Sequence, residues 1–170
     1  CAAGWNFREN PEPRSPVLGH IYLVREGREL TVDVLHTVRG LSSDDLSLTE
    51  KITLRDGRSY AVPAPEIMLK AKIANVATLQ QDNRQDARHA KIMAVCCRHY
   101  LMDAYAAVAA KQIAERDAVN RYMSTLRVIR TPEARQVDLQ HGLNLATALP
   151  LREKLAELPR FPRLTAFYDH

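Results

Sequence analysis

The hydrophobic pattern of this chain changes once, near residue 64, and that change restricts the folds open to it. Before it, β-favouring runs alternate with turn signals. After it, apolar residues recur only at helical spacing. A chain in which strands precede an uninterrupted series of helices is typical of the α+β class. We therefore predict a β-hairpin part over 1–63 and a helical part over 64–170, together forming one compact unit.

Two hairpins are predicted in the first part. The first turns at Glu26-Gly27, where glycine tolerates a positive φ, and the second turns at Asp56-Gly57, a strong hairpin signal. The predicted strands are 21–24, 30–35, 51–55 and 59–62. We expect them to form one antiparallel sheet of about four strands, with a short helical turn between the hairpins capped by Ser42 or Ser43.

Helix signals dominate the second part. Pro65 suits a first helical position, and Leu69, Ile73 and Val76 recur at helical spacing behind it. The predicted helices are 66–81, a second from about 84 through Cys96, a third over about 103–130, a fourth from Pro132 to about 147, and a short last one in LPLREKLAELP.

Composition sets broad limits on function. The 170 residues are 46% hydrophobic and 26% charged, with a net charge of +4 and a sequence pI near 9.1, which is compatible with a nucleotide or nucleic-acid partner. No apolar run approaches the ~18 residues of a membrane span, so no membrane partner is expected. Three cysteines, two of them vicinal, make a poor disulfide framework and favour a cytoplasmic location. Cys1 at the start fits a mature lipoprotein loosely, and we favour a chain that starts within a longer protein.

One acid, Asp33, stands inside an apolar strand-like run, TVDVL. Alternation along a strand puts Asp33 on one face, and puts Leu30, Val32 and Val34 on the other, which we expect to belong to the core. Asp33 then faces either a cleft or solvent. As a plain edge-strand residue it would be hydrogen-bonded by Arg28 or Arg39.

An ordered series of motifs surrounds this acid. VDV is followed by the second hairpin, then by VPAPE with a lysine inside the helix, and then by the RQD element that opens the next helix. In this order the chain, over residues 20–101, resembles the C-terminal portion of nucleotidyltransferase-like proteins, which include the minimal nucleotidyltransferases and the abortive-infection type of toxin.

The resemblance implies roles for five residues. Asp33 would be a catalytic acid and Mg²⁺ ligand, Lys70 or Lys72 would meet a phosphate of the nucleoside triphosphate, Asp86 would pair with or orient that lysine, and Arg84 would bind the nucleotide. Lys70 and Lys72 lie roughly 200° apart around a helix, so they cannot share one face. The implied activity is transfer of a nucleoside monophosphate to an RNA or protein hydroxyl, and Asp33 should lie near the helix that begins at Pro65.

The family's defining element is missing from these residues. It consists of Gly-Ser followed by D-x-D on one strand, yet no glycine here precedes serine and no D-x-D occurs. Either those acids lie upstream of Cys1, and Mg²⁺ binds only with them, or the chain is a non-catalytic module that binds nucleic acid or a partner protein. The 170 residues alone are not expected to be a competent catalyst, because one carboxylate holds Mg²⁺ weakly.

Two further groups are candidates for a site. Cys96, Cys97 and His99 suggest a metal, but adjacent cysteines diverge by about 100° on a helix, so we reject zinc and assign Cys96 to the core. Arginines are frequent in the later helices and offer either a solvated surface, which we favour, or a phosphate-binding face: Arg116, Arg121, Arg127, Arg130, Arg135, Arg152, Arg160 and Arg163.

Overall fold

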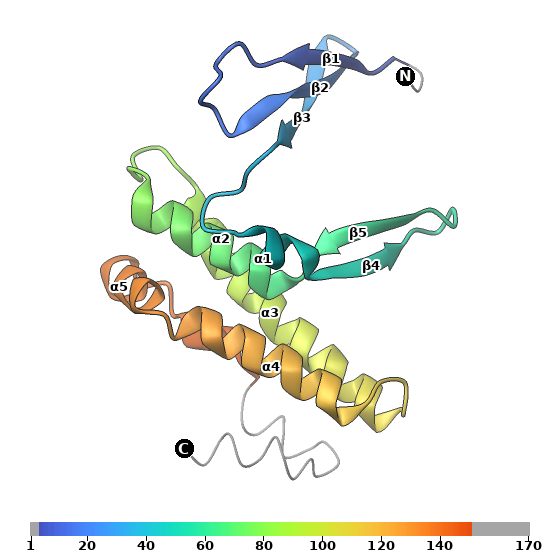
Figure 1. Cartoon of the computed structure of the whole chain (residues 1–170), viewed down its shortest axis with the longest axis vertical. Helices are drawn as coiled ribbons and strands as arrows, with labels where there is room; N and C mark the ends of the chain where they lie inside the picture. Colours follow the sequence, from blue (N-terminus) through green and yellow to red (C-terminus); the bar gives the residue numbers. More distant parts are fainter. Residues whose placement is uncertain (1–3, 151–170) are drawn as a thin grey trace.

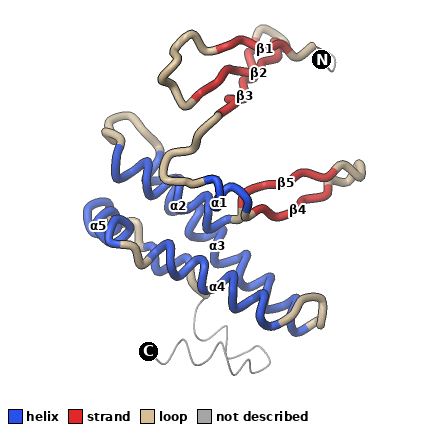
Figure 2. The backbone as a smooth tube through the Cα atoms, in the orientation of Figure 1, coloured by secondary structure: helices blue, strands red, loops and turns tan. Residues whose placement is uncertain are grey.

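The structure, a computed structural model, describes residues 4–150 and shows two small antiparallel sheets followed by helices that pack on one another (Figures 1 and 2). The predicted α+β class is confirmed. The strands are β1 (Asn6–Glu9), β2 (Val17–Arg25), β3 (Arg28–Leu35), β4 (Thr49–Thr53) and β5 (Ser59–Pro63). The helices are α1 (Ser43–Ser47), α2 (Pro65–Thr78), α3 (Asp86–Ala109), α4 (Glu115–Ile129), α5 (Pro132–His141) and the 3-10 turn η1 (Leu145–Ala148).

Both predicted hairpins form. Glu26 and Gly27 both have positive φ, 51° and 75°, which lets the two-residue turn match the twist of β2 and β3. In the second hairpin Asp56 accepts a hydrogen bond from the Arg58 backbone N–H at 3.1 Å and stabilises the turn.

The hairpins do not join into the single sheet that we expected. β4 and β5 pair only with each other among the described strands, whereas β2 and β3 gain a third strand, β1, that the sequence analysis missed. In Figure 1 the β1–β3 sheet stands apart from the helices at one end of the molecule, and residues 36–42 connect it to them. The described strands therefore form two separate sheets, with no backbone hydrogen bonds between the first hairpin and the second.

Capping residues set several helix boundaries. Ser42 and Asp45 form a capping box at α1, with the Ser42 hydroxyl accepting from the Asp45 N–H at 3.2 Å. Pro65 occupies the first turn of α2 as predicted. Thr131 caps α5, and Gly142 ends it in the left-handed conformation.

The core lies among the helices in two clusters. One joins α2, α3, α4, α5 and η1 around Leu69, Ile73 and Cys97, and the other joins α3 and α4 around Leu101 and Tyr105. Burial of the predicted stripe Leu69, Ile73 and Val76 is confirmed. Because these side chains are at most 4% exposed, their burial contributes to the hydrophobic driving force that attaches α2.

Two predicted helix boundaries are wrong. The expected helix over 103–130 is divided, since α3 runs on to Ala109 and Lys111 takes a left-handed φ of 58° before α4 starts at Glu115. The break contains no glycine or proline, so no local signal marks it. The helix expected up to residue 147 ends at His141, and η1 follows. The assignment of Cys1 and most of the last predicted helix fall outside the described residues, as do Arg152, Arg160 and Arg163.

Gly40 fixes the connection between the β1–β3 sheet and α2. Its φ is +77°, and a Cβ built there would lie 2.3 Å from the Cβ of Ala74 in α2. Real Cβ atoms do not approach that closely, so only glycine lets residues 36–42 lie on the helix at this point.

We predict that Gly40→Ala destabilises the protein more than Gly57→Ala does. Both glycines have φ near +80°, but a Cβ at Gly57 meets nothing within 4 Å. Gly57→Ala should therefore cost about 1 kcal/mol of left-handed strain, and Gly40→Ala that amount plus a clash of ~1–3 kcal/mol. Chemical denaturation of both variants measures the difference, and equal losses would mean that the contact with Ala74 is unimportant.

Candidate functional site

Asp33 lies on β3 directly opposite His20 of β2. Its Oδ1 is 2.8 Å from His20 Nδ1, and 57% of the Asp33 side chain is exposed. Arg8 of β1 lies on the same face, with its guanidinium carbon 4.5 Å from the centre of the Tyr22 ring. Although its sequence neighbours are apolar, Asp33 therefore pays no cost of burying a charge, because its side chain is exposed to water. Its hydrogen-bond partner is His20 rather than Arg28 or Arg39.

The opposite face of this sheet is not the core that we expected. Leu30 and Val32 are 52% and 54% exposed, and Phe7 and Ile21, which share that face, are also exposed. The reason is architectural: a three-stranded sheet buries an apolar face only if another layer packs on it, and Figure 1 shows the sheet standing apart from the helices.

A compact ionic cluster forms where α2 meets the start of α3. Asp86 opens α3 with its side chain 7% exposed. Arg84 Nε lies 2.6 Å from its Oδ2, Lys72 Nζ lies 3.7 Å from its Oδ1, and the Asn75 amide donates to Oδ1 at 3.3 Å. Three of the five residues singled out by the resemblance, Lys72, Arg84 and Asp86, are therefore in contact.

The electrostatics of this cluster keep Asp86 ionised. Burial alone raises the pKa of a carboxyl group, but the hydrogen bonds from Arg84 and Asn75 and the charge of Lys72 outweigh it, so the pKa of Asp86 falls below its ordinary value. Lys72 and Arg84 keep 26% and 44% of their side chains exposed. The cluster thus presents two cations to solvent around a buried acid.

Lys70 belongs to a different contact. Its Nζ lies 2.8 Å from Asp45 Oδ2, and Asp45 also completes the capping box of α1. Hydrogen bonds from Lys70 and Ser42 lower the pKa of Asp45. Lys70 thus ties α1 to α2, while Lys72 points to Asp86, and neither lysine is brought to Asp33. β3, which carries Asp33, stands apart from α2 in Figure 1, so the expected position of Asp33 beside the Pro65 helix is not observed.

A second polar cluster escaped the sequence analysis. Glu50 of β4 accepts a hydrogen bond from the Tyr100 hydroxyl of α3 and forms an ion pair with Arg121 of α4, with 3.1 Å between Arg121 Nη2 and Glu50 Oε1. Glu66, in the first turn of α2, is 4% exposed nearby. These residues are up to 71 positions apart, so no local pattern could reveal the cluster.

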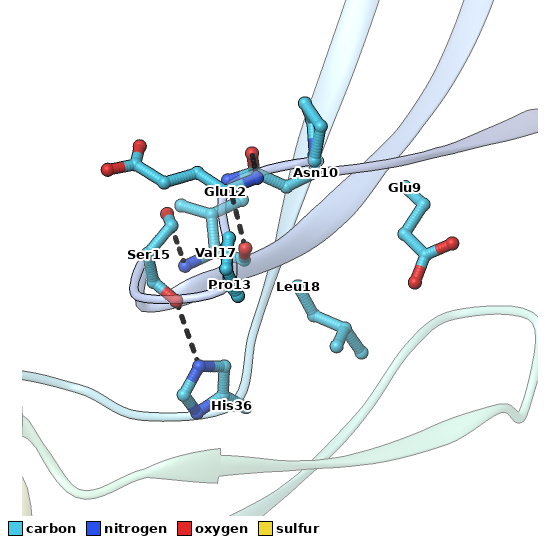
Figure 3. Close-up of a pocket in the computed structure, with 9 residues that line it drawn as sticks. Glu9, Asn10, Glu12, Pro13, Ser15, Val17, Leu18 and His36 are labelled. Carbon is cyan, nitrogen blue, oxygen red and sulfur yellow. Dashed lines mark hydrogen bonds between the residues drawn. The ribbon is translucent and has the colours of Figure 1, made fainter.

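Figure 3 shows a pocket on the loop between β1 and β2, lined by Glu9, Leu18 and His36 among others. His36 Nε2 lies 2.9 Å from the Ser15 carbonyl, and Ser15 Oγ accepts from the Val17 N–H at 3.1 Å. Its polar groups thus hold the loop in place, and they bring together no nucleophile and base.

The cysteine assignment is corrected by the structure. Cys97 is buried in the core, and burial raises the pKa of its thiol, whereas Cys96 is exposed. The two adjacent cysteines do point in different directions from the helix, as predicted, but Cys97 and not Cys96 is the one in the core. Between residues 4 and 150 no three His, Cys, Asp or Glu side chains are grouped so that they can hold a metal ion.

Comparison with known proteins finds no matching family model, no matching curated protein and no matching solved structure. Among the described residues, no helix has both the length and the apolar character needed to cross a membrane.

We predict that Asp86→Asn lowers the free energy of unfolding by about 1–3 kcal/mol at neutral pH, because it weakens hydrogen bonds to a charged acceptor. Since folding lowers the pKa of Asp86, its stabilisation is complete above the ordinary value of 3.8 and is lost as the pH falls through the folded-state pKa. Chemical denaturation at pH 7 and in acid checks this. Asp103→Asn, at an exposed carboxylate of α3, is the matched control and should change little.

Proposed function

We propose that this chain is nucleotidyltransferase-like and contributes the phosphate-binding part of a protein that transfers a nucleoside monophosphate to an RNA or protein hydroxyl. The observation that supports this is the cluster of Lys72, Arg84 and Asp86. A buried acid held between two part-exposed cations positions them without neutralising them fully, which suits them to meet the oxygens of a nucleoside triphosphate.

Lys72 is the better candidate of the two lysines. Lys70 makes a close ion pair, 2.8 Å from Asp45, whereas Lys72 lies 3.7 Å from an acid that Arg84 already approaches at 2.6 Å. Lys72 therefore has more of its hydrogen-bonding capacity left for a ligand. Arg84 would add a second cation at the same place.

Mg²⁺ does not fit the acids of the described residues by themselves. Asp33 is engaged with His20, and no second acid or histidine joins them in a group that can hold a metal. We therefore assign the chain a role in binding phosphate and derive no metal-dependent step from it. Transfer would require further acids of the D-x-D kind, which this sequence lacks.

Lys72→Met should weaken binding of a nucleoside triphosphate about tenfold at low ionic strength, the equivalent of ~1.4 kcal/mol, and Lys70→Met should leave binding unchanged. A fluorescent triphosphate analogue titrated into each variant measures the affinity, and added salt should weaken wild-type binding. The two lysines lie on the same helix and point in different directions, so Lys70→Met serves as the matched control for the loss of one positive charge from α2. Equal affinities for both variants and the wild type would contradict the proposal.

A non-catalytic module that binds a partner protein is the second candidate. It is favoured by the apolar face of the β1–β3 sheet, formed by the exposed side chains of Phe7, Ile21, Leu30 and Val32 and the half-buried ones of Leu23 and Val34. Glu9 lies at one end of this face, and Arg25 and Arg28 lie at the other. The fitting partner has an apolar surface with a basic group opposite Glu9 and an acidic group opposite the arginines.

Val32→Lys and the neighbouring Thr31→Lys test whether that face is open, because residues 31 and 32 lie on opposite faces of β3. Val32→Lys should strongly reduce binding of an apolar fluorescent dye, and Thr31→Lys should not. Undiminished dye binding by Val32→Lys would remove the support for a docking face there. Neither change should alter triphosphate binding, so the two candidate functions are tested separately.

A further inference from the structure

The β4–β5 hairpin is attached to the helices at its base through Glu50. This residue of β4 accepts the Tyr100 hydroxyl hydrogen bond and pairs with Arg121, whose guanidinium carbon lies 4.6 Å from the centre of the Tyr100 ring. One side chain of the hairpin thus contacts both α3 and α4. The rest of the hairpin extends away from the helices (Figure 1), with Ile52 and Tyr60 exposed.

Glu66 follows the end of β5 by three residues and lies in the first turn of α2. Its side chain is almost fully buried, and its Oε2 atom has no hydrogen-bond partner. A buried, unpartnered carboxylate oxygen is costly if the group is charged. Burial of the same oxygen costs far less free energy if the carboxyl group carries a proton.

The groups that act on Glu66 come from every neighbouring element. β4 supplies Glu50, a second carboxylate. The neighbours on α3 are Tyr100 and Cys97, and those on α4 are Arg121 and Ser124. Arg121 is the one cation in this set, and its guanidinium is already paired with Glu50.

The balance of these effects makes Glu66 harder to ionise than a free glutamic acid. Burial raises the pKa of Glu66 and the charge of Glu50 raises it further, while the α2 backbone, Ser124 and Arg121 oppose the rise without cancelling it. Loss of the proton would place a second negative charge beside Glu50 in a site with one cation for both.

We propose that Glu50 and Glu66 form a proton-dependent junction that seats the β4–β5 hairpin on the helices while Glu66 is protonated and loosens it when Glu66 ionises. The device is local: it concerns the hairpin base and leaves the cores around Leu69 and Tyr105 in place. It gives the protein a hairpin whose attachment responds to pH.

The expected sign follows from proton linkage. In the unfolded chain Glu66 titrates at its ordinary value of 4.5, and in the folded chain it titrates higher. Its contribution to stability is therefore complete below 4.5 and is lost as the pH rises through the folded-state value. Glu66→Gln mimics the neutral acid and should remove this dependence.

The experiment compares wild-type protein, Glu66→Gln and Glu12→Gln, a change at an exposed loop carboxylate. Urea denaturation of each across pH 5 to 9 gives the stability difference from wild type. We expect the difference for Glu66→Gln to shift in favour of the variant as the pH rises, and that for Glu12→Gln to stay constant. Hydrogen-exchange protection of amides 49–63 should fall with rising pH in the wild type and not in Glu66→Gln.

A Glu66→Gln protein whose stability differs from that of the wild type by the same amount at every pH would overturn the proposal, because it would mean that no titration of Glu66 is coupled to folding in this range. If Glu66→Gln fails to fold, infrared spectroscopy of the wild type decides. A carbonyl band of a protonated carboxylic acid that persists above pH 4.5, the ordinary pKa of a glutamic acid, and disappears with loss of hairpin protection supports the junction, and its absence contradicts it.

Discussion

The arrangement of the described residues depends on the burial of α2. Side chains on nearly all sides of this helix are buried, and it contacts α3, α4 and α5. Because its Ala74 also meets Gly40, the helix fixes the path of the chain that leads from the β1–β3 sheet. A helix surrounded in this way sets the positions of the groups attached to it. Lys72 and Glu66 are such groups.

Two buried acids beside this helix show how surroundings decide chemistry. Asp86 lies against Arg84 and Lys72, which hold it ionised and leave cations at the surface. Glu66 lies beside another carboxylate and shares one arginine with it, which favours its proton. Both acids begin helices, where a negative charge is favourable, so the difference comes from the neighbouring elements and not from helix position.

The local features of the fold were readable from the chain. Asp56-Gly57 and Glu26-Gly27 identify their turns, and Thr131-Pro132 identifies a helix start, because each restricts the backbone over only a few residues. The Lys72–Asp86 contact agrees with the pairing that the resemblance implied, and it forms because the neighbouring helices α2 and α3 pack against each other. The helix break at 110–114 could not be predicted, since it contains neither glycine nor proline and follows a run of alanines.

The sequence by itself determined most of the strands and helices, with β1 and the break between α3 and α4 as exceptions, because hydrophobic period and turn chemistry act over short distances. Tertiary structure alone decided which side chains meet and which faces are covered. It left Leu30 and Val32 exposed and joined Glu50 to Tyr100 and Arg121. The Asp33–His20 pair, in contrast, follows from the register that the two-residue Glu26-Gly27 turn imposes on β2 and β3. Burial and pairing depend on how separate elements pack, and residues 50 or more positions apart carry no local record of that packing.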